Sequence, residues 1–332
     1  MSDGIDWLPI HQRLKEGSMW RLWAVAEGLT KTLSAIFQKL VGVVMGTLEM
    51  GCIAAAIIGF LQMLLGFTGY AATHRTTRSR LVPDFQSVLL MIFLGFLAGI
   101  FGTVLSIYTF TLGADLAIRT LFISSSVVPA SIAAAFLWPK TDGLDVRQIV
   151  GITIFLAAMW AMLDFPDLSL LRGLETWVWL TLVLAAVNAL GELVTRATAV
   201  KFDVWVNNLW IGGSTVVFSI LGLVLFLAIK GSAGIDITHA FLWGTLAIGV
   251  LVAAMASFRI LAYRGGGTIA LRKIIMPGVY LISAMLAGIW LYGEPMTMGK
   301  LVGVLMWFVA IYFVDRKASE DLALLFARKR VV

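Results

Sequence analysis

The chain has 332 residues, of which 60% are hydrophobic and only 13% are charged, and its mean hydropathy is +0.94. Soluble domains carry about 25% charged residues, so the composition excludes an ordinary soluble protein. The chain is therefore divided into membrane spans rather than into soluble domains. The net charge of +6 would suggest nucleic acid in a soluble chain. In a membrane protein it fits basic cytoplasmic loops and anionic lipid headgroups, so we expect a bilayer and no nucleic-acid partner.

The N-terminal segment, residues 1–19, is polar and lacks an apolar core with a cleavage site. We therefore expect a cytoplasmic segment rather than a cleaved signal peptide. The single cysteine, Cys52, lies in an apolar stretch, which rules out an intramolecular disulfide and a cluster of thiolate metal ligands. We expect neither a metal nor a cofactor.

Ten apolar windows are long enough to cross a bilayer, for which about 20 residues are needed. None of them alternates as barrel strands do, and backbone groups in lipid must be satisfied within the segment, so helices are expected. The predicted fold is an all-α integral membrane protein with ten transmembrane helices. The windows are 20–40, 44–72, 86–110, 114–137, 146–165, 175–200, 206–229, 239–263, 268–292 and 299–315.

Lysine and arginine are distributed unequally between the two sides of the membrane. With the N-terminus inside, 15 of them fall in inner segments and 4 in outer loops. Because basic residues are enriched in cytoplasmic loops, this count predicts that both termini are cytoplasmic. The localisation expected is the plasma membrane, that is, the bacterial inner membrane.

The chain contains a faint internal repeat. Residues 117–151 have the layout of residues 268–303, so that Arg119 corresponds to Arg272, and residues 24–31 resemble 189–196 at a spacing of 165. Each half then holds five spans, and five is odd, so the second half enters the membrane from the opposite side. This predicts two inverted five-helix repeats, an architecture typical of secondary transporters. The expected parts are the segment 1–19, the repeats 20–165 and 166–315, and a basic cytoplasmic tail, 316–332.

Polar stripes mark the first and sixth windows. Glu27 and Lys31 are one helical turn apart, and Asn188, Glu192 and Arg196 continue that spacing over two turns. A charge at the bilayer centre costs roughly 2.5–3.5 kcal/mol on insertion scales and so faces a cavity or a partner. Either the stripes line a substrate pathway, or each is a local ion pair that lets a marginal helix insert. We favour the pathway.

Other charged residues inside the windows extend this candidate site. Arg259 and Tyr263 share a helix face and are expected to line the same cavity. Arg119 and Arg272 lie near the starts of their windows, so each is either a gate residue or a lipid anchor. Basic residues in the windows outnumber acidic ones by six to two, which favours an anionic or zwitterionic solute over a simple cation. The predicted substrate-binding residues are Glu27, Lys31, Asn188, Glu192, Arg196, Arg259 and Tyr263, and the gate candidates are Arg119 and Arg272.

A junction between the last two windows carries a family resemblance. It reads Gly-Glu-Pro-Met-Thr-Met-Gly-Lys-Leu-Val-Gly, and Gly293, Glu294, Thr297, Lys300 and Gly303 fit the pattern of EamA-type transporters of the drug/metabolite transporter superfamily, which the chain resembles over most of its length. The first half departs from the pattern at residues 138–140, Trp-Pro-Lys. The resemblance implies alternating access by rocking of helix bundles, without ATP hydrolysis, and a small-molecule metabolite as substrate. Glu294 is expected to be structural.

Two other classes of protein stay open. A membrane-embedded enzyme, such as a lipid-modifying transferase, would need acid, base or metal groups in the membrane, yet His11, His74 and His239 fall in predicted tails or loops. We therefore expect no catalytic residues and no enzyme activity. A non-transporting subunit or scaffold of a larger membrane complex is the main alternative, and a homodimer is also compatible with the sequence.

Overall fold

The protein is described here by a computed structural model that covers residues 10–77, 80–82, 84–114, 116–162, 175–199, 201–230, 235–293 and 295–314. Residues 1–9, the expected boundary at 165 and 166, Glu294 and the tail 316–332 lie outside the described residues. The described part is helical and contains no strand. Its elements are α1 (Ile10–Val44), α2 (Leu48–Thr77), α3 (Phe85–Phe96), the π-helix η1 (Leu97–Leu105), α4 (Ser106–Thr111), α5 (Leu116–Ser124), α6 (Val127–Leu137), α7 (Pro139–Asp142), α8 (Val146–Met162), α9 (Thr176–Thr198), α10 (Val204–Lys230), α11 (His239–Arg264), α12 (Ile269–Tyr292) and α13 (Met298–Val314).

Helix occupies each of the ten predicted windows, and seven of the described spans are long and apolar enough to cross a membrane. α8 and α13 provide two shorter apolar helices, and α1 is 35 residues long but carries more charge. The seven spans suffice to define the class of the molecule. It is an all-helical integral membrane protein. The spans are 48–74, 85–111, 119–137, 176–198, 204–229, 239–264 and 274–292.

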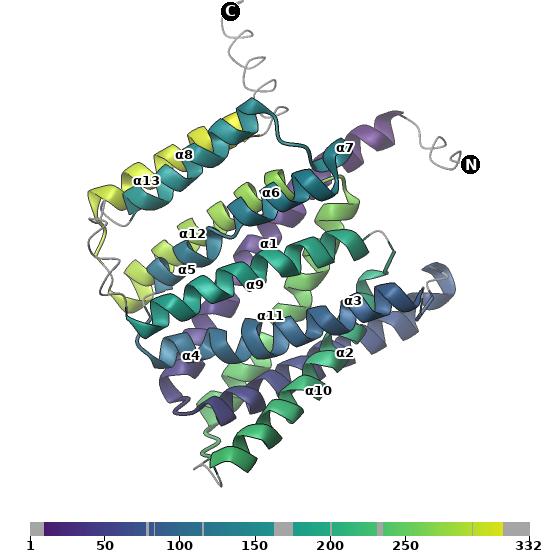
Figure 1. Cartoon of the computed structure of the whole chain (residues 1–332), viewed down its shortest axis with the longest axis vertical. Coiled ribbons are helices and arrows are strands. Elements are labelled where there is room, and N and C mark those ends of the chain that lie inside the picture. Colours follow the sequence, from purple (N-terminus) through teal and green to yellow (C-terminus); the bar gives the residue numbers. More distant parts are fainter. Residues whose placement is uncertain are drawn as a thin grey trace, which may run out of the picture.

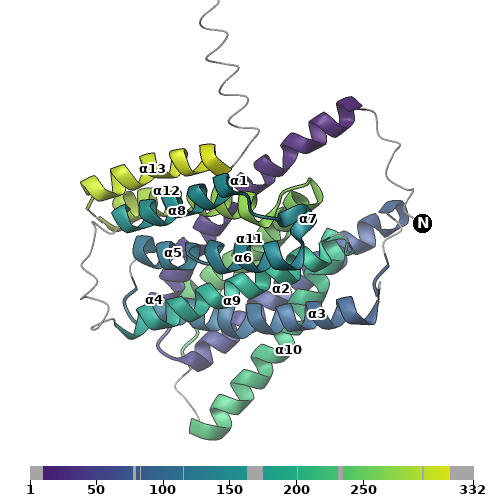
Figure 2. The same cartoon turned by 45° about the horizontal axis from the view of Figure 1, so that its top comes forward.

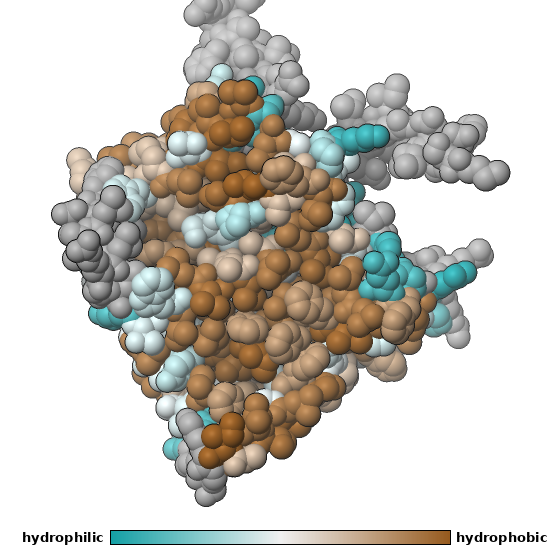
Figure 3. Space-filling view, in the orientation of Figure 1, coloured by the Kyte–Doolittle hydropathy of each residue, from teal (hydrophilic) through white to brown (hydrophobic). Residues whose placement is uncertain are grey.

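The outer surface is apolar, as a lipid-facing surface must be. Hydrophobic residues cover most of the face in Figure 3. Large apolar side chains on the outside of α10, among them Leu221 and Leu225, are more than half exposed. A contiguous apolar patch of this kind on a water-soluble monomer would drive association. Here it matches the requirement that helices present apolar side chains to hydrocarbon.

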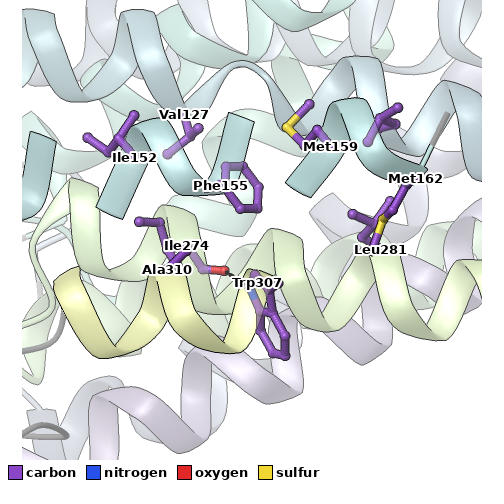
Figure 4. Packing of buried hydrophobic residues seen from close by; sticks show 10 residues of the cluster. Val127, Ile152, Phe155, Met159, Met162, Ile274, Leu281, Trp307 and Ala310 are labelled. Carbon is purple, nitrogen blue, oxygen red and sulfur yellow. Dashed lines mark hydrogen bonds between the residues drawn. The ribbon is translucent and has the colours of Figure 1, made fainter. Parts of the chain in front are cut away.

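α8 and α13 lie side by side as a pair at one edge of the bundle (Figures 1 and 2). Their shared core includes Phe155 of α8 and Trp307 of α13, and it continues to Leu281 of α12 (Figure 4). The Trp307 indole nitrogen donates a hydrogen bond of 3.1 Å to the carbonyl of Ile274, so the one polar atom of this side chain is satisfied inside the apolar core. The pair is thereby attached to α12.

The rest of the bundle is built on close helix crossings. α1 packs against α11 and α12, α9 packs against α3, α5 and α6, and α2 packs against α10. At the crossing of α2 and α10 two glycines face each other: a Cβ on Gly59 would lie 2.9 Å from the Gly212 carbonyl, and one on Gly212 would lie 2.6 Å from the Gly59 carbonyl. Only a residue without a side chain allows this approach, which is how small residues bring membrane helices together.

The third predicted span is not one regular α-helix. Asp84 caps its start by accepting a hydrogen bond of 2.8 Å from the Ser87 backbone N–H. The hydrogen bond from the Ser87 hydroxyl, together with this backbone contact, lowers the pKa of the Asp84 carboxyl. The π-helix η1 then interrupts the span before α4 completes it. Such bulges occur frequently at functional sites, and η1 lines the cavity described below.

Candidate solute cavity and buried ion cluster

Four charged side chains from four helices meet inside the bundle. Glu27 of α1 and Glu192 of α9 face Arg259 of α11 and Arg272 of α12. Arg259 Nε lies 2.9 Å from a Glu27 carboxylate oxygen and 3.6 Å from one of Glu192. Arg272 lies 3.1 Å from the second Glu27 oxygen and donates a hydrogen bond to Glu192. The two formal negative charges cancel the two positive ones.

Tyr263 of α11 completes this group, which we name the ion cluster: Glu27, Glu192, Arg259, Tyr263 and Arg272. Its hydroxyl donates a hydrogen bond of 2.7 Å to Glu192, and the Arg272 guanidinium lies 4.9 Å from the centre of its ring. Arg272 and Glu27 are fully buried. Breaking a buried ion pair by removing one partner is strongly destabilising, so the cluster holds α1, α9, α11 and α12 together.

The pairing differs from the local pairs considered from sequence. Lys31 points at the Tyr280 ring, with its ammonium 4.8 Å from the ring centre. Arg196 forms an ion pair of 3.1 Å with Asp142, which also accepts a hydrogen bond of 2.8 Å from the backbone N–H of Ile269. Arg196 thus joins α9 to α7 and to the start of α12.

A cavity of about 140 Å³ lies between helices of both predicted halves. This volume has room for several water molecules and so for a small solute. Three cationic side chains line it, Lys31, Arg119 and Arg259, together with the amides of Gln38 and Asn188, and the described lining contains no carboxylate. The remaining lining residues are Ser34, Ala35, Leu94, Leu97, Ala98, Gly102, Thr103, Ser106, Ile123, Leu184, Val187, Gly191, Val252, Met255 and Tyr280.

Arg119 differs from the other buried arginines in its partners. Its Nε donates a hydrogen bond of 2.8 Å to the Thr109 hydroxyl, and a terminal nitrogen donates to both the carbonyl, at 3.2 Å, and the hydroxyl of Ser106. Its guanidinium lies 4.4 Å from the centre of the Phe110 ring, and the Tyr280 phenol is a further neighbour. Only 1% of Arg119 is exposed. None of its described partners carries a negative charge.

The helices set the order of these groups along the cavity. The cluster lies where α9 and α11 end and α12 begins, whereas α1 continues past Lys31 and Ser34 to Gln38, whose side-chain oxygen accepts a hydrogen bond of 2.9 Å from Ser106. Glu27 and Gln38 are 11 residues apart, or about 16 Å at 1.5 Å per residue. The ion cluster and Arg119 therefore occupy opposite ends of the cavity.

The predicted site residues fall into three groups. Lys31, Asn188, Arg259 and Arg119 line the cavity; Glu27, Glu192, Tyr263 and Arg272 stand behind it in the cluster; and Arg196 is directed toward Asp142. Sequence reasoning did not identify Gln38, Ser106 or Thr109, although Ser34 and Gln38 continue the Glu27–Lys31 spacing along one helix face. That continuation was the signal available.

No metal centre is evident in the described part of the chain, since no three His, Cys, Asp or Glu residues there gather to hold an ion.

Comparisons with known proteins support the fold and give no family name. No protein-family profile matches the chain, and no curated protein matches it. Among solved structures, 28 chains match. One of them, described only as a protein in a crystal structure, has a TM-score of 0.62 and 14% sequence identity, over 91% of this chain and 98% of its own. At this identity the likeness concerns the fold alone, and it extends over nearly the whole length of both chains.

Proposed function

We propose that the protein is a secondary transporter that moves a small anionic or zwitterionic solute across the membrane by alternating access. The observation that carries this proposal is the cavity, which has a cationic wall and is bounded at one end by the ion cluster and at the other by Arg119. Charged residues buried inside a membrane bundle commonly mark a solute or ion pathway. The solute would occupy the cavity while one end or the other is closed.

The helix contacts support ten spans in two inverted repeats. If α1, α2, α3 to α4, α5 to α6 and α8 correspond in order to α9, α10, α11, α12 and α13, each major contact has a counterpart. The contact of α1 with α11 matches that of α9 with α3; α1 with α12 matches α9 with α5; and α2 with α11 matches α10 with α3. The pairs α2 with α10 and α8 with α13 join equivalent helices, as contacts on a two-fold axis do.

Equivalent residues support the same relation at a spacing of 153. Gly113 and Gly266 both adopt positive φ, +88° and +91°, two residues after a helix ends. The N–H of Gly113 bonds to the Phe110 carbonyl at 3.0 Å, and that of Gly266 bonds to the Tyr263 carbonyl at 3.1 Å. The facing glycines, 59 and 212, have this spacing too.

The first and sixth helices follow a nearly identical register. α1 ends at Val44 and α9 at Thr198, a spacing of 154. The proposed register therefore replaces the spacing of 165 expected from residues 24–31 and 189–196, which aligns short similar stretches that lie at different distances from the helix ends. Glu27 and Glu192 meet in the ion cluster without being repeat equivalents.

Membership of the EamA-type transporters is part of this proposal and still rests on the junction around Gly293 and on the repeat. The orientation with both termini in the cytoplasm is also part of this proposal, and its support is the distribution of Lys and Arg.

Flux into proteoliposomes tests the proposal. Purified protein is reconstituted, the vesicles are loaded with a mixture of amino acids and of mono- and dicarboxylates, and counterflow of each labelled compound is measured. We expect saturable exchange of at least one anionic or zwitterionic compound that is lost in Lys31→Gln, which removes a cavity-lining cation outside the ion cluster. Absence of exchange for all compounds, together with co-purification of a stoichiometric membrane partner, would instead identify a non-transporting subunit.

A further inference from the structure

We infer that Arg119 is the binding residue for a carboxylate group of the solute, which it holds at the end of the cavity remote from the ion cluster. That the ligand is a transported solute rests on the proposed function, whereas the binding site follows from the geometry of the described residues. It names both a subsite and the chemical class of its ligand.

Arg119 and Arg272 occupy equivalent positions in the two halves. They are 153 residues apart, and each stacks on an aromatic ring with that same spacing, Arg119 on Phe110 and Arg272 on Tyr263. Each is fully or almost fully buried. The two differ in charge compensation: Arg272 contacts two carboxylates, whereas the described partners of Arg119 are hydroxyl groups, a carbonyl and rings.

The residues that replace the two carboxylates are both neutral. When α1 and α9 are aligned at their C-terminal ends, Gln38 of α1 corresponds to Glu192 of α9. The residues that these two contact also correspond: Gln38 bonds to Ser106, and Glu192 contacts Arg259, which lies 153 residues after Ser106. Glu27 corresponds to the region of Thr181, which is uncharged and buried. The Arg119 end of the cavity thus repeats the ion cluster without its anions.

A buried guanidinium without a counter-charge is costly in a membrane, and a ligand that supplies the missing charge recovers that cost. A carboxylate is the anion that this architecture already pairs with the equivalent arginine. Its two oxygens match the planar donor set of a guanidinium. Arg119 also lines the cavity, so a solute can reach it without unfolding of the bundle.

The inference is tested first without any ligand, by placing a carboxylate on the protein. Gln38→Glu puts the charge where the repeat has Glu192, and it should raise the Tm of the purified protein in detergent by a few degrees. The matched control is Gln62→Glu. Gln62 of α2 is buried whereas Gln38 is half-buried, and Gln62 donates a hydrogen bond to the neutral Asn208 rather than lying near an arginine, so the same change should lower the Tm. A fall in the Tm of Gln38→Glu as large as that of Gln62→Glu overturns the inference.

The second test uses ligands in matched pairs: small carboxylic acids and amino acids, each with its primary amide, and inorganic phosphate. At least one acid should raise the Tm of the wild-type protein while its amide does not. The acid's affinity should weaken about tenfold or more in Arg119→Gln and in Gln38→Glu, with partial retention in Arg119→Lys. Stabilisation by phosphate alone, or by no acid at all, overturns the assignment to a carboxylate.

These measurements separate the subsite from transport. Acid binding that depends on Arg119, without counterflow in proteoliposomes, supports the carboxylate subsite and contradicts the proposed transport function. Counterflow that is unchanged in Arg119→Gln and Gln38→Glu supports the proposed transport function and contradicts the carboxylate subsite at Arg119.

Discussion

At the scale of single residues, the ion cluster is a balanced set of charges in a place where imbalance is costly. Glu27 and Glu192 contribute two negative charges, and Arg259 and Arg272 two positive ones, all within 3.6 Å of a partner. The attraction between the paired charges offsets the desolvation free energy of these ions only while every partner is present. The cluster is therefore sensitive to the loss of any one charge and less sensitive to the loss of a matched pair.

Glu27→Gln tests this balance. It leaves one buried positive charge in excess, so we expect a loss of about 3–5 kcal/mol of stability, the range seen when one partner of a buried pair is removed. The double variant Glu27→Gln/Arg259→Gln restores neutrality and should recover part of that loss. The measurement is the SDS or thermal denaturation midpoint of the purified proteins. Additive losses in the double variant would show that the residues do not act as a balanced group.

At the scale of elements, the contact between α2 and α10 lies on the proposed two-fold axis. The Gly59 and Gly212 carbonyls each occupy the space where the other residue's Cβ would stand. Neither helix can be displaced at this point without loss of the many contacts on both sides of the crossing, because interiors at native density leave little free volume.

Gly212→Ala should push α2 and α10 apart. Its new methyl group meets the Gly59 carbonyl at 2.6 Å and backbone atoms of Met63, and overpacking of this kind costs about 1–3 kcal/mol. The neighbouring Gly213→Ala is the control, since its Cβ would meet only flexible Met63 side-chain atoms, the nearest at 3.5 Å. Tm values in detergent should fall for Gly212→Ala and stay level or rise for Gly213→Ala. Equal shifts would contradict the close crossing.

The positions of the helices could be predicted from sequence because hydropathy depends only on local composition. The π-helix η1 inside the third span could not, since it carries no proline or charge. The break between α5 and α6 does have a sequence signal, Pro129 in the first turn of α6, because proline removes a backbone donor and is tolerated at the start of a helix but not in its interior. The prediction of one continuous window did not use this signal. For the site, the intramembrane charges were evident, but their partners were not. Glu27 and Arg259 are 232 residues apart in sequence, and only the helix crossings decide that Glu27 pairs with Arg259 rather than with Lys31.

At the scale of the whole molecule, the proposed inverted repeat gives two halves with the same fold and different charges. The contacts among helices repeat between the halves, whereas the carboxylates gather with the arginines at one end of the cavity and leave Arg119 at the other. Under the proposed alternating access, similar backbone motions would close either end, and the charges would decide which end is held shut. In this structure the end at the ion cluster is held by ion pairs, and the Arg119 end by hydrogen bonds to neutral groups.

Access to the cavity from the two sides of the membrane is the most direct test of transport. Cys52, the single cysteine, is replaced by alanine, and Val187, which lines the cavity, is replaced by cysteine. The reagent is 2-sulfonatoethyl methanethiosulfonate, an anion that does not cross the bilayer, applied to right-side-out and to inside-out vesicles. Val183→Cys, one turn earlier and exposed on the outside of the helix, is the control and should react from neither side, since lipid shields it. Alternating access predicts that Val187→Cys is labelled from both sides. Labelling from one side only, or from neither, would contradict the account.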